Sequence, residues 1–542
     1  MLLVADAPSY DVVVVGSGAG GLVGALRAAS HGLSVVVLEK ADVLGGTTAL
    51  SGAGLWAPAN LHVLAAGQTD DLETARTYLE HTVGDRTPLS MQDAFLSAAA
   101  ATIGWLEEQD VRFAYMTGYP DYHPDQPGGL LTGRAITPKA IKRARLAGLP
   151  PLAIRPKLTM GDGGPPIPDT GPDGPIWGGQ SLIGQLLVAC LDAGVEIWPS
   201  TAFTDLLVET GSVVGVTASH AGRSFRIAAR AGVLLAGGGF EQNAQMRREF
   251  QSGTVGHADW TLGVEGNTGD GIRAGMLLGA ATDLLEDCWW APGFLRPDGA
   301  ASFLLWERAA PVGIIVDQAG RRWANEGAPY NTFGHLMLAA QAAGTPCIPS
   351  WFIFDQAGLD TYGFGGIRPG GDAADWVDAG TLVRADSLAA LAAALGTSEL
   401  AATVARWNGF VEVGTDDDFG RGSDGSYERQ LLSVFQRYPG IPGPHHHPNP
   451  SLAPVATGPF YAGQVVLSDL GTKGGLVCDE QARVVRKDGT AIRGLYACGN
   501  TMASMMGHAY PGPGACITPA MAFGALAADA MSTAFTAAQV SS

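Results

Sequence analysis

The sequence predicts an α/β protein built on a Rossmann-like nucleotide-binding domain. Residues 10–21, YDVVVVGSGAGG, form an apolar β-run that leads into a glycine-rich turn. LVGALRAASHG then reads as a helix and LSVVVLEK as a second strand. Two later segments, AARAGVLLAGGGFEQN (228–243) and GLYACGNTMASMMG (494–507), read as strands that end in glycine and return to the same sheet.

The N-terminal βαβ unit predicts a dinucleotide site. Gly16, Gly18 and Gly21 follow the G-x-G-x-x-G pattern, and Glu39 stands 18 residues after Gly21, at the end of the second strand. The glycines let the backbone approach a pyrophosphate, to which the helix N-terminus offers free N–H groups and a positive dipole end. Glu39 can accept hydrogen bonds from a ribose diol.

A second loop favours FAD over NAD as the cofactor. Residues 41–58, ADVLGGTTALSGAGLWAP, follow the acid and can wrap a long cofactor, and they bring three hydroxyl side chains to an isoalloxazine ring. The residues expected to contact FAD are Gly16, Ser17, Gly18, Ala19, Gly20, Gly21, Glu39, Lys40, Gly46, Thr47, Thr48, Ser51, Gly52, Ala236, Gly237, Asn267, Asp270, Gly499, Asn500, Gly514 and Ala515.

The composition of the chain excludes several classes of protein. The 542 residues, 46% of them apolar, are enough for two or more domains, and the net charge of −19 argues against nucleic-acid binding. The six cysteines form no CxxC pair, so we expect buried free thiols and no zinc site. The N-terminus lacks a basic leader region, and no apolar run reaches the roughly 18 residues of a membrane span, so a cytoplasmic protein is expected.

The segment GHAYPGPGAC (507–516) is the most unusual loop of the chain. Two Pro-Gly pairs exclude both a central strand and a helix start, so the segment is expected to be a stiff loop. Such a loop would hold the phenol of Tyr510 on one side and the bare amide of Gly514 on the other.

Several motifs together resemble the fumarate reductase and 3-ketosteroid dehydrogenase superfamily of flavoproteins. They are GGTTALSGAGLW, AGGGFEQN, GNTGDGIRAG (266–275), RRWANEGAPY (321–330), GTKGGLVCD (471–479) and GLYACGN. Within that superfamily, YPDYHPDQPGG (119–129), APY (328–330) and YPGPGA (510–515) resemble the 3-ketosteroid Δ1-dehydrogenases.

The resemblance covers most of the chain and implies an FAD-binding domain that is split in sequence by an inserted α+β catalytic domain, which acts as a lid. We expect the FAD-binding domain at 1–284 and 456–542 and the catalytic domain at 285–455. The Pro-rich segment 439–454 is the expected return linker.

The resemblance also implies catalytic roles. Tyr510 and Gly514 would donate hydrogen bonds to the C3 ketone of a steroid, which makes the α-proton at C2 acidic. Tyr330 would remove that proton while the C1 hydride passes to flavin N5. A phenol with a pKa near 10 is a poor base at neutral pH, so a second tyrosine is expected beside it. We assign that role to Tyr122, with Tyr119 as the rival.

The expected function is therefore FAD-dependent 1,2-desaturation of 3-ketosteroids, with an external electron acceptor. One alternative is a fumarate-reductase-type reductase of an unsaturated acid. It would need cations to clamp carboxylates, but 494–542 and 326–340 contain no Lys or Arg. A 3-ketosteroid Δ4-dehydrogenase shares the chemistry but is not expected to carry the YPGPG loop. A flavin-binding protein without turnover is a third alternative, and tyrosines at all three reactive positions argue against it.

No metal site is expected. His445, His446 and His447 are consecutive, so their side chains should diverge within a solvated linker. The Asp-rich segment 414–426 lacks a Glu at the twelfth position from its first Asp and is interpreted as a solvated loop rather than a calcium loop. His508 is expected to be a packing or hydrogen-bonding neighbour of Tyr510.

The segment 133–160 departs from the family pattern and is interpreted as a basic insertion. Between residues 126 and 161 there is no acid, whereas seven residues are basic: Arg134, Lys139, Lys142, Arg143, Arg145, Arg155 and Lys157. One interpretation is an exposed loop that pairs with acids elsewhere. The other is a peripheral membrane contact, in which the cations meet an anionic leaflet and Leu146, Leu149, Leu152 and Ile154 enter the interface.

Overall fold

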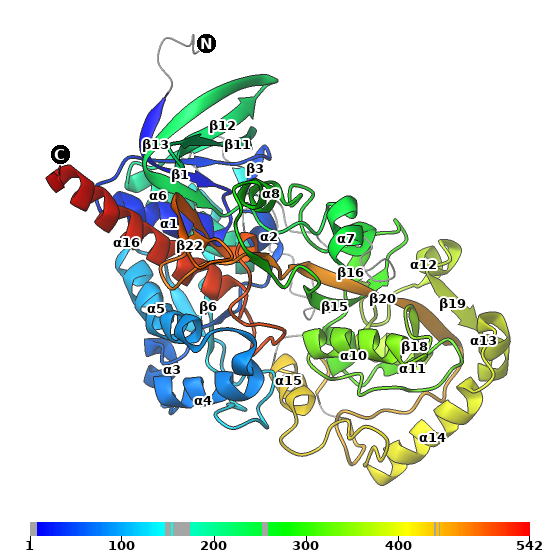
Figure 1. Ribbon diagram of the computed structural model, residues 1–542. Coiled ribbons are helices and arrows are strands. Elements are labelled where there is room, and N and C mark those ends of the chain that lie inside the picture. Colours follow the sequence, from blue (N-terminus) through cyan, green and yellow to red (C-terminus); the bar gives the residue numbers. More distant parts are fainter. Residues whose placement is uncertain are drawn as a thin grey trace.

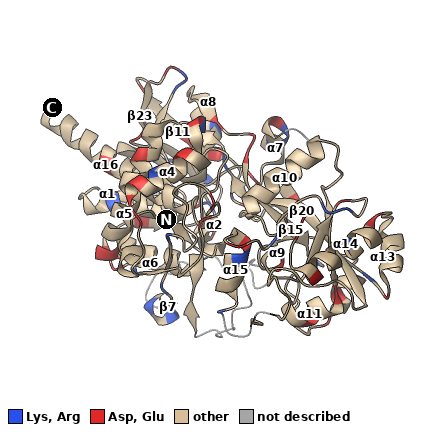
Figure 2. Cartoon of the chain, turned by 90° about the horizontal axis from the view of Figure 1, so that it is seen from below, with Lys and Arg blue, Asp and Glu red and all other residues tan. Residues whose placement is uncertain are grey.

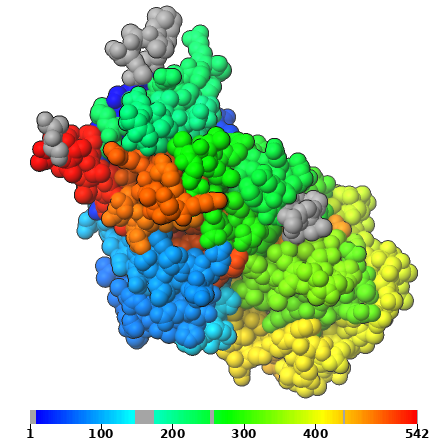
Figure 3. Space-filling model, viewed as in Figure 1, coloured from blue at the N-terminus to red at the C-terminus, as the bar shows by residue number. Residues whose placement is uncertain are grey.

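The computed structural model describes residues 8–146, 153–154, 174–251, 258–437, 441–443 and 445–541 (Figure 1). Both termini lie beside the first of two large sheets, and the second sheet lies at the opposite end of the molecule. Figure 3 shows C-terminal residues, in orange, lying between the blue N-terminal part and the green middle part. The two ends of the chain are therefore joined in one body.

The first sheet has eight strands and contains the predicted βαβ unit. β1 (Ser9–Val15) pairs in parallel with β2 (Val35–Leu38) and with β13 (Arg223–Leu235), and β23 (Ala491–Ala497) pairs in parallel with β13. The sheet is completed by β10 (Glu196–Trp198), β11 (Thr201–Glu209), β12 (Ser212–His220) and β22 (Arg483–Val485). The two glycine-terminated segments thus return to the sheet of the N-terminal unit, as predicted.

Two helices that pack against this sheet also touch each other unusually closely. α1 (Ala19–Ser30) packs along α16 (Ile517–Ser541). A Cβ atom on Gly524 would lie 2.3 Å from the carbonyl oxygen of Gly20, and a Cβ on Gly20 would lie 2.7 Å from that of Ala520. Glycine is therefore required where the two helix backbones touch, which accounts for glycines beyond the cofactor motif.

The second sheet is antiparallel and has six strands, and β20 (Phe460–Thr472) pairs with three of them. The other members are β15 (Cys288–Leu295), β16 (Ala301–Phe303), β17 (Gly313–Val316), β18 (Ser350–Asp355) and β19 (Leu382–Ala385). β20 falls in the segment 456–542 that we expected to rejoin the first sheet. The chain instead pairs within the second sheet as far as Thr472 before it returns through β22 and β23.

The remaining elements are short strands and helices around the two sheets. The strands are β3 (Val43–Leu44), β4 (Leu55–Trp56), β5 (Phe113–Tyr115), β6 (Ala135–Pro138), β7 (Ile141–Lys142), β8 (Ala153–Ile154), β9 (Pro175–Ile176), β14 (Thr282–Asp283) and β21 (Gly475–Leu476). The helices are α2 (Gly46–Leu50), α3 (Leu61–Ala65), α4 (Leu72–Thr82), α5 (Leu89–Glu108), α6 (Gly178–Asp192), α7 (Ala244–Phe250), α8 (Asp270–Leu277), α9 (Trp306–Ala309), α10 (Tyr330–Ala342), α11 (Gln356–Tyr362), α12 (Ala374–Asp378), α13 (Leu388–Leu395), α14 (Leu400–Val413) and α15 (Tyr427–Phe435).

The basic segment is only partly described, and one of its cations is not at the surface. Arg134 is fully buried and forms ion pairs with Asp70 (2.8 Å) and Asp121 (2.9 Å), so its inclusion in an exposed basic stretch was wrong. Arg145 forms an ion pair with Asp110. Leu149, Leu152, Arg155 and Lys157 lie outside the described residues. Among the helices that are described, none is long and apolar enough to span a bilayer.

Candidate active site

A cavity of about 960 Å³ is lined by residues from both sheets. This volume lies at the upper end of the usual range for small-molecule sites, as expected where two ligands bind side by side. Tyr122, Tyr330, Tyr510 and Gly514 all line it. The predicted FAD residues line it too, except Ala515, which is fully buried and lines a small adjoining pocket.

The glycine-rich turn has the properties of a pyrophosphate site. Gly16 has φ of +105°, and a Cβ there would lie 2.4 Å from the carbonyl oxygen of Ala236. Gly18 is the N-cap of α1 and offers no side-chain cap, while a Cβ on it would meet nothing closer than Thr48 Oγ1 at 3.8 Å. The first N–H groups of α1 therefore face an open cradle that suits a phosphate.

Glu39 lies at the edge of this cradle with its carboxylate already oriented. Oε2 accepts hydrogen bonds from the backbone N–H (3.1 Å) and the hydroxyl (2.5 Å) of Ser17, and Oε1 accepts one from Ala41 N (2.9 Å). These donors hold the carboxylate against the turn, where it lines the cavity. The arrangement fits the expected contact with a ribose diol.

The other polar residues expected to contact FAD also hold the cavity wall together. Lys40 Nζ forms an ion pair with Asp270 (2.9 Å). Thr47 Oγ1 accepts hydrogen bonds from Val264 N (3.3 Å) and Asn267 Nδ2 (3.2 Å). Thr48 Oγ1 accepts one from Ala19 N, whereas Ser51 Oγ donates to Thr48 O. Since Thr47 and Thr48 act as acceptors here, their hydroxyl hydrogens stay available to a cofactor. The residues therefore fit FAD.

The three predicted tyrosines meet at one point of the cavity wall. Their ring centroids are 5.3 Å apart for Tyr122 and Tyr330, 5.3 Å for Tyr122 and Tyr510, and 5.2 Å for Tyr330 and Tyr510. Tyr330 is the first residue of α10, directly after the N-cap Pro329. The loop of Tyr122 is tied to that of Tyr510 because Tyr122 N donates to Pro511 O (2.8 Å).

Burial controls the acidity of these phenols. It raises the pKa of Tyr122, Tyr330 and Tyr510 well above the usual value, since the charged forms are poorly solvated. The neighbouring Tyr122 hydroxyl opposes the effect of burial on the pKa of Tyr330, whereas the Tyr510 hydroxyl adds to it. Tyr122 therefore lies where it can favour negative charge on Tyr330.

Tyr119, the rival to Tyr122, lies farther along the wall. Its ring packs edge-on against Phe435 at 6.3 Å. Tyr427, which was not predicted from the sequence, has its ring 5.3 Å from that of Tyr122 and a buried hydroxyl. Tyr427 begins α15 after a Ser N-cap and carries no motif of its own, so only its place in the fold reveals it.

Position 514 must be glycine because of its backbone conformation and a close contact within the protein, not because a ligand needs the space. Its φ is +83°, and a Cβ would lie 1.7 Å from the carbonyl oxygen of Gly54. The close contact that excludes a side chain here is with the segment before β4. Within the described chain the amide of Gly514 has no hydrogen-bond acceptor, so it can donate to a ligand.

Several residues beside Tyr510 were not predicted. The Trp289 ring lies 5.0 Å from the Tyr510 ring, and Cys516 Sγ lies 3.2 Å from the Tyr510 hydroxyl. Lys473 is fully buried behind the loop, although the loop itself has no cation. In the sequence, only the lysine of the motif GTKGGL could have indicated this residue. Arg143, Arg296 and Arg368 also line the cavity, outside the two segments whose lack of cations we had noted.

Two segments that were not expected to bind metal, the histidine run and the Asp-rich loop, differ from their predicted structure. The rings of His445 and His447 do not diverge but lie 4.8 Å apart. The Asp-rich loop is not simply solvated, because Asp416 is buried and pairs with Arg322 (2.9 Å). The six thiols are free as predicted, and all are buried except the partly exposed Cys516.

Comparisons with known proteins agree with this site. The family model for the FAD binding domain matches residues 11–517. A 3-oxosteroid 1-dehydrogenase from Mycobacterium tuberculosis is 42% identical, with 96% of this chain and 97% of the relative aligned. A 4-oxocyclohexanecarboxylate 2-dehydrogenase from Sinomonas cyclohexanicum is 34% identical over 96% of this chain and 92% of its own.

One solved structure extends this likeness to the fold. The 3-ketosteroid Δ1-dehydrogenase of Sterolibacterium denitrificans, in complex with 1,4-androstadiene-3,17-dione, superposes with a TM-score of 0.88 at 32% identity. The alignment covers 97% of this chain and all of that one. The chain belongs to the FAD-binding flavoprotein family and, within it, to the group of the 3-oxosteroid 1-dehydrogenases.

Proposed function

We propose that this protein is an FAD-dependent 3-ketosteroid dehydrogenase that converts the C1–C2 single bond next to a C3 ketone into a double bond. The observation that carries the proposal is the meeting of Tyr122, Tyr330 and Tyr510 beside the free amide of Gly514, on the wall of the cavity that the FAD residues line. The apolar remainder of that wall, which includes Trp306 and Phe435, suits a steroid.

Tyr510 and Gly514 polarise the ketone in this proposal. The Tyr510 hydroxyl and the Gly514 N–H both donate to the C3 oxygen, which becomes an enolate oxygen as the C2 proton leaves. Both donors are held before substrate arrives, so little reorganisation is needed when charge develops. One such donor contributes about 3–4 kcal/mol to the stabilisation of the transition state.

Tyr330 accepts the C2 proton, and Tyr122 donates a hydrogen bond to its oxygen. The Tyr122 ring, 5.3 Å from that of Tyr330, supports Tyr122 rather than Tyr119 as the partner of the base. FAD, when bound, would supply the acceptor for the C1 hydride, and an external acceptor would then take the two electrons. The residues of the cavity hold the steroid so that both hydrogens leave from adjacent carbons.

Anaerobic mixing of the FAD-loaded protein with androst-4-ene-3,17-dione tests the proposal. Loss of the oxidised flavin absorbance with formation of the 1,4-diene supports it. Bleaching by 4-oxocyclohexanecarboxylate alone would point to a small cyclic ketone as substrate, which the 34% identical relative brings forward. Reoxidation of the reduced flavin by fumarate would indicate a reductase, and no redox response to any of these would indicate a binding protein.

We propose further that the module around the second sheet acts as a lid over the cofactor. Tyr330 is carried by α10 of that module, whereas Tyr510 and Gly514 precede α16, which packs on α1 of the first sheet. The base and the oxyanion donors therefore come from different modules. Limited proteolysis with and without a steroid product tests this, because closure should slow cleavage between the modules.

We also propose that the basic segment makes a peripheral membrane contact. Lys139, Lys142 and Arg143 are exposed, and Figure 2 shows blue Lys and Arg positions of the chain gathered at β7. Each such cation contributes about 1 kcal/mol near an anionic leaflet. Deletion of the basic segment would also remove β8, which pairs with β3 beside the FAD loop. Substitution of the three cations by Gln is therefore the cleaner test. The parent should sediment with anionic vesicles at low salt and the triple variant should not; a parent that ignores the vesicles excludes the contact.

A further inference from the structure

A buried lysine holds the loop that carries Tyr510. Lys473 has no exposed surface, and its ammonium donates to the carbonyl oxygens of His508 (2.9 Å) and Ala509 (3.3 Å). Those carbonyls belong to the two residues directly before Tyr510. Lys473 therefore fixes the backbone from which the proposed oxyanion donor projects.

The charge of Lys473 is balanced by the carboxylate of Asp287. Asp287 Oδ2 lies 3.3 Å from Lys473 Nζ. Burial alone would raise the pKa of Asp287, but Lys473 and the donors His335 and His508 hold it well below the usual range. Asp287 also accepts a hydrogen bond from Trp290 Nε1 (2.8 Å), so the carboxylate is fixed as an anion.

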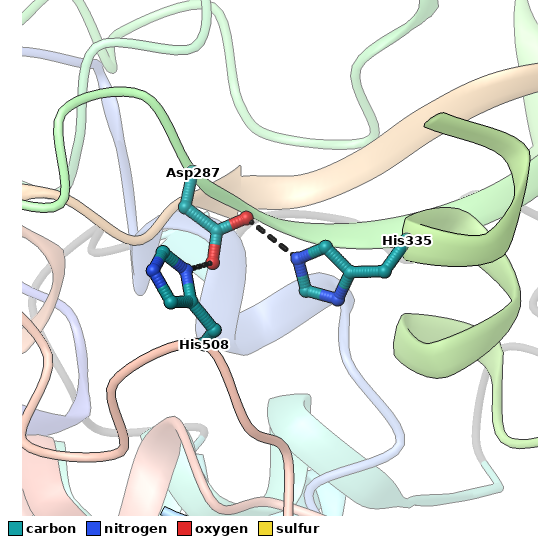
Figure 4. A group of neighbouring side chains, drawn as sticks. All are labelled: Asp287, His335 and His508. Atoms are coloured by element: carbon teal, nitrogen blue, oxygen red, sulfur yellow. Dashed lines mark hydrogen bonds and ion pairs between the residues drawn. The ribbon is translucent and has the colours of Figure 1, made fainter. Parts of the chain in front are cut away.

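Figure 4 shows how Asp287 lies between His335 and His508, a group that at first resembles a metal site. The two histidines bond to different oxygens of the carboxylate: His335 Nε2 to Oδ1 and His508 Nδ1 to Oδ2, both at 2.9 Å. They do not converge on an empty point. The ammonium of Lys473 and the guanidinium of Arg86, 3.2 Å from His508 Nε2, already supply positive charge there. The group is better described as the anchor of an ion pair.

Trp289 joins this ion pair to the reactive tyrosine. Lys473 Nζ lies 4.6 Å from the centroid of the Trp289 ring, which packs against Tyr510 at 5.0 Å. The indole N–H donates to Asn500 Oδ1 (3.0 Å), so the ring cannot turn away. The lysine thus contacts the ring that packs against Tyr510, whereas Asp287 contacts the two histidines and Trp290.

A buried ion pair of this kind is a poor way to gain stability, because desolvation of both charges offsets their attraction. We propose that Lys473 is a positioning residue for the oxyanion site: it fixes the backbone before Tyr510 and directs a positive potential at the place where the C3 oxygen becomes negative. The proposal rests on the proposed ketosteroid function and adds to it a charged residue that does not touch the substrate.

A phenolic steroid is the probe that measures this potential. Estrone carries a hydroxyl at C3 of an aromatic ring, and its phenolate resembles the enolate, while its 3-deoxy analogue lacks the charge. The affinity of the FAD-loaded protein for both would be measured by calorimetry across pH 6–10. The pH dependence for estrone reports the pKa of the bound phenol, and the deoxy analogue reports the shape of the pocket.

Opposite substitutions should move that pKa in opposite directions. Lys473→Met removes the positive charge and should raise the pKa of bound estrone by about one unit, which is tenfold weaker phenolate binding. Burial lowers the pKa of Lys473, and Asp287 opposes this. Asp287→Asn removes the anion that offsets the lysine and should lower the pKa of bound estrone over the pH range in which Lys473 keeps its proton. Lys473→Arg keeps the charge and should restore most of the effect. Affinity for the deoxy analogue should change less than twofold in all three.

The outcomes separate this inference from the function on which it rests. Steady-state kinetics should follow binding, with kcat about tenfold lower in Lys473→Met and KM nearly unchanged. Shifts of the same sign in the Met and Asn variants, or none, would overturn the role of Lys473. If Lys473→Met does not fold, Asp287→Asn and Lys473→Arg decide alone. A parent protein that binds neither estrone nor androst-4-ene-3,17-dione refutes the function itself.

Discussion

Replacement of Tyr330 by Phe removes one oxygen atom and, in the proposed mechanism, the base. The ring is held by Phe303 at 5.1 Å and by the two other tyrosines, so its packing should survive. Tyr330 is only 4% exposed, which leaves no room for bulk water to replace the phenol as base. We therefore expect the loss to reach the upper end of the usual range for a general base, about 10³–10⁴-fold.

The assay is a single turnover under anaerobic conditions, followed by the loss of oxidised flavin absorbance. Tyr330→Phe should bleach about 10³-fold or more slowly, with the affinity for the 1,4-diene product within a few-fold of the parent. Exchange of the C2 hydrogens of the substrate with D₂O, measured by mass spectrometry, should be lost as well, because exchange requires the base but not hydride transfer.

Tyr427→Phe is the matched control. It makes the same chemical change in the same cluster, with its ring 5.3 Å from Tyr122, but its buried hydroxyl has no hydrogen-bond partner among the described residues. Its turnover should stay within a few-fold of the parent. Near-normal bleaching in Tyr330→Phe, or equal losses in both variants, would refute the assignment of the base.

Four further outcomes follow from the same geometry. Burial raises the pKa of Tyr330, and the base must be deprotonated, so kcat/KM should increase with pH from 7 to 9.5; a profile that falls over this range contradicts a phenolate base. Tyr510→Phe should weaken binding of 3-keto ligands more than Tyr330→Phe does, by about tenfold as calorimetry would show, and equal affinities would invalidate the division of roles. Glu39→Ala should be purified partly without FAD and regain activity when FAD is added, whereas full occupancy with low turnover would place Glu39 elsewhere. Burial, with a smaller effect of Asp469, raises the pKa of Glu241 to about 7, above that of the unfolded chain, so its contribution to stability is present in acid and is lost as pH rises towards 7. The Tm of Glu241→Gln minus that of the parent should therefore increase from pH 5 to pH 8, because only the parent loses stability as this carboxyl ionises. A constant difference would contradict the raised pKa of Glu241.

The features that the sequence predicts are those coded within one segment. The βαβ unit needs only the order strand, glycine turn, helix, strand and acid, and all of these stand within residues 9–39. Tyr122, Tyr330 and Tyr510 were found because each stands in a short motif. Where the structure adds a residue, the reason is a contact between distant segments, as between Trp289 and Tyr510.

Two errors have the same origin. The FAD-binding domain was expected to resume at residue 456 because the Pro-rich segment 439–454 was interpreted as the return linker, but the thirteen residues of β20 find their partners in β15, β18 and β19. Arg134 was counted as a surface cation because its neighbours in sequence are basic. Asp70 and Asp121, which neutralise it, lie 64 and 13 residues away. Charge counted along the chain does not reveal which cations are buried.

The 507–516 loop gains its rigidity from the whole site rather than from its prolines alone. The carbonyl oxygen of Pro511 accepts both the Tyr78 hydroxyl (2.7 Å) and the backbone N–H of Tyr122 (2.8 Å), and a Cβ on Gly512 would lie 2.3 Å from the Trp56 ring. Tyr122 thus shares one anchor with Tyr510, and its ring packs against that of Tyr330 at 5.3 Å. Because the proposed base lies on α10 and the proposed oxyanion donors lie on this loop, Tyr122 is the residue that connects the two parts of the proposed site.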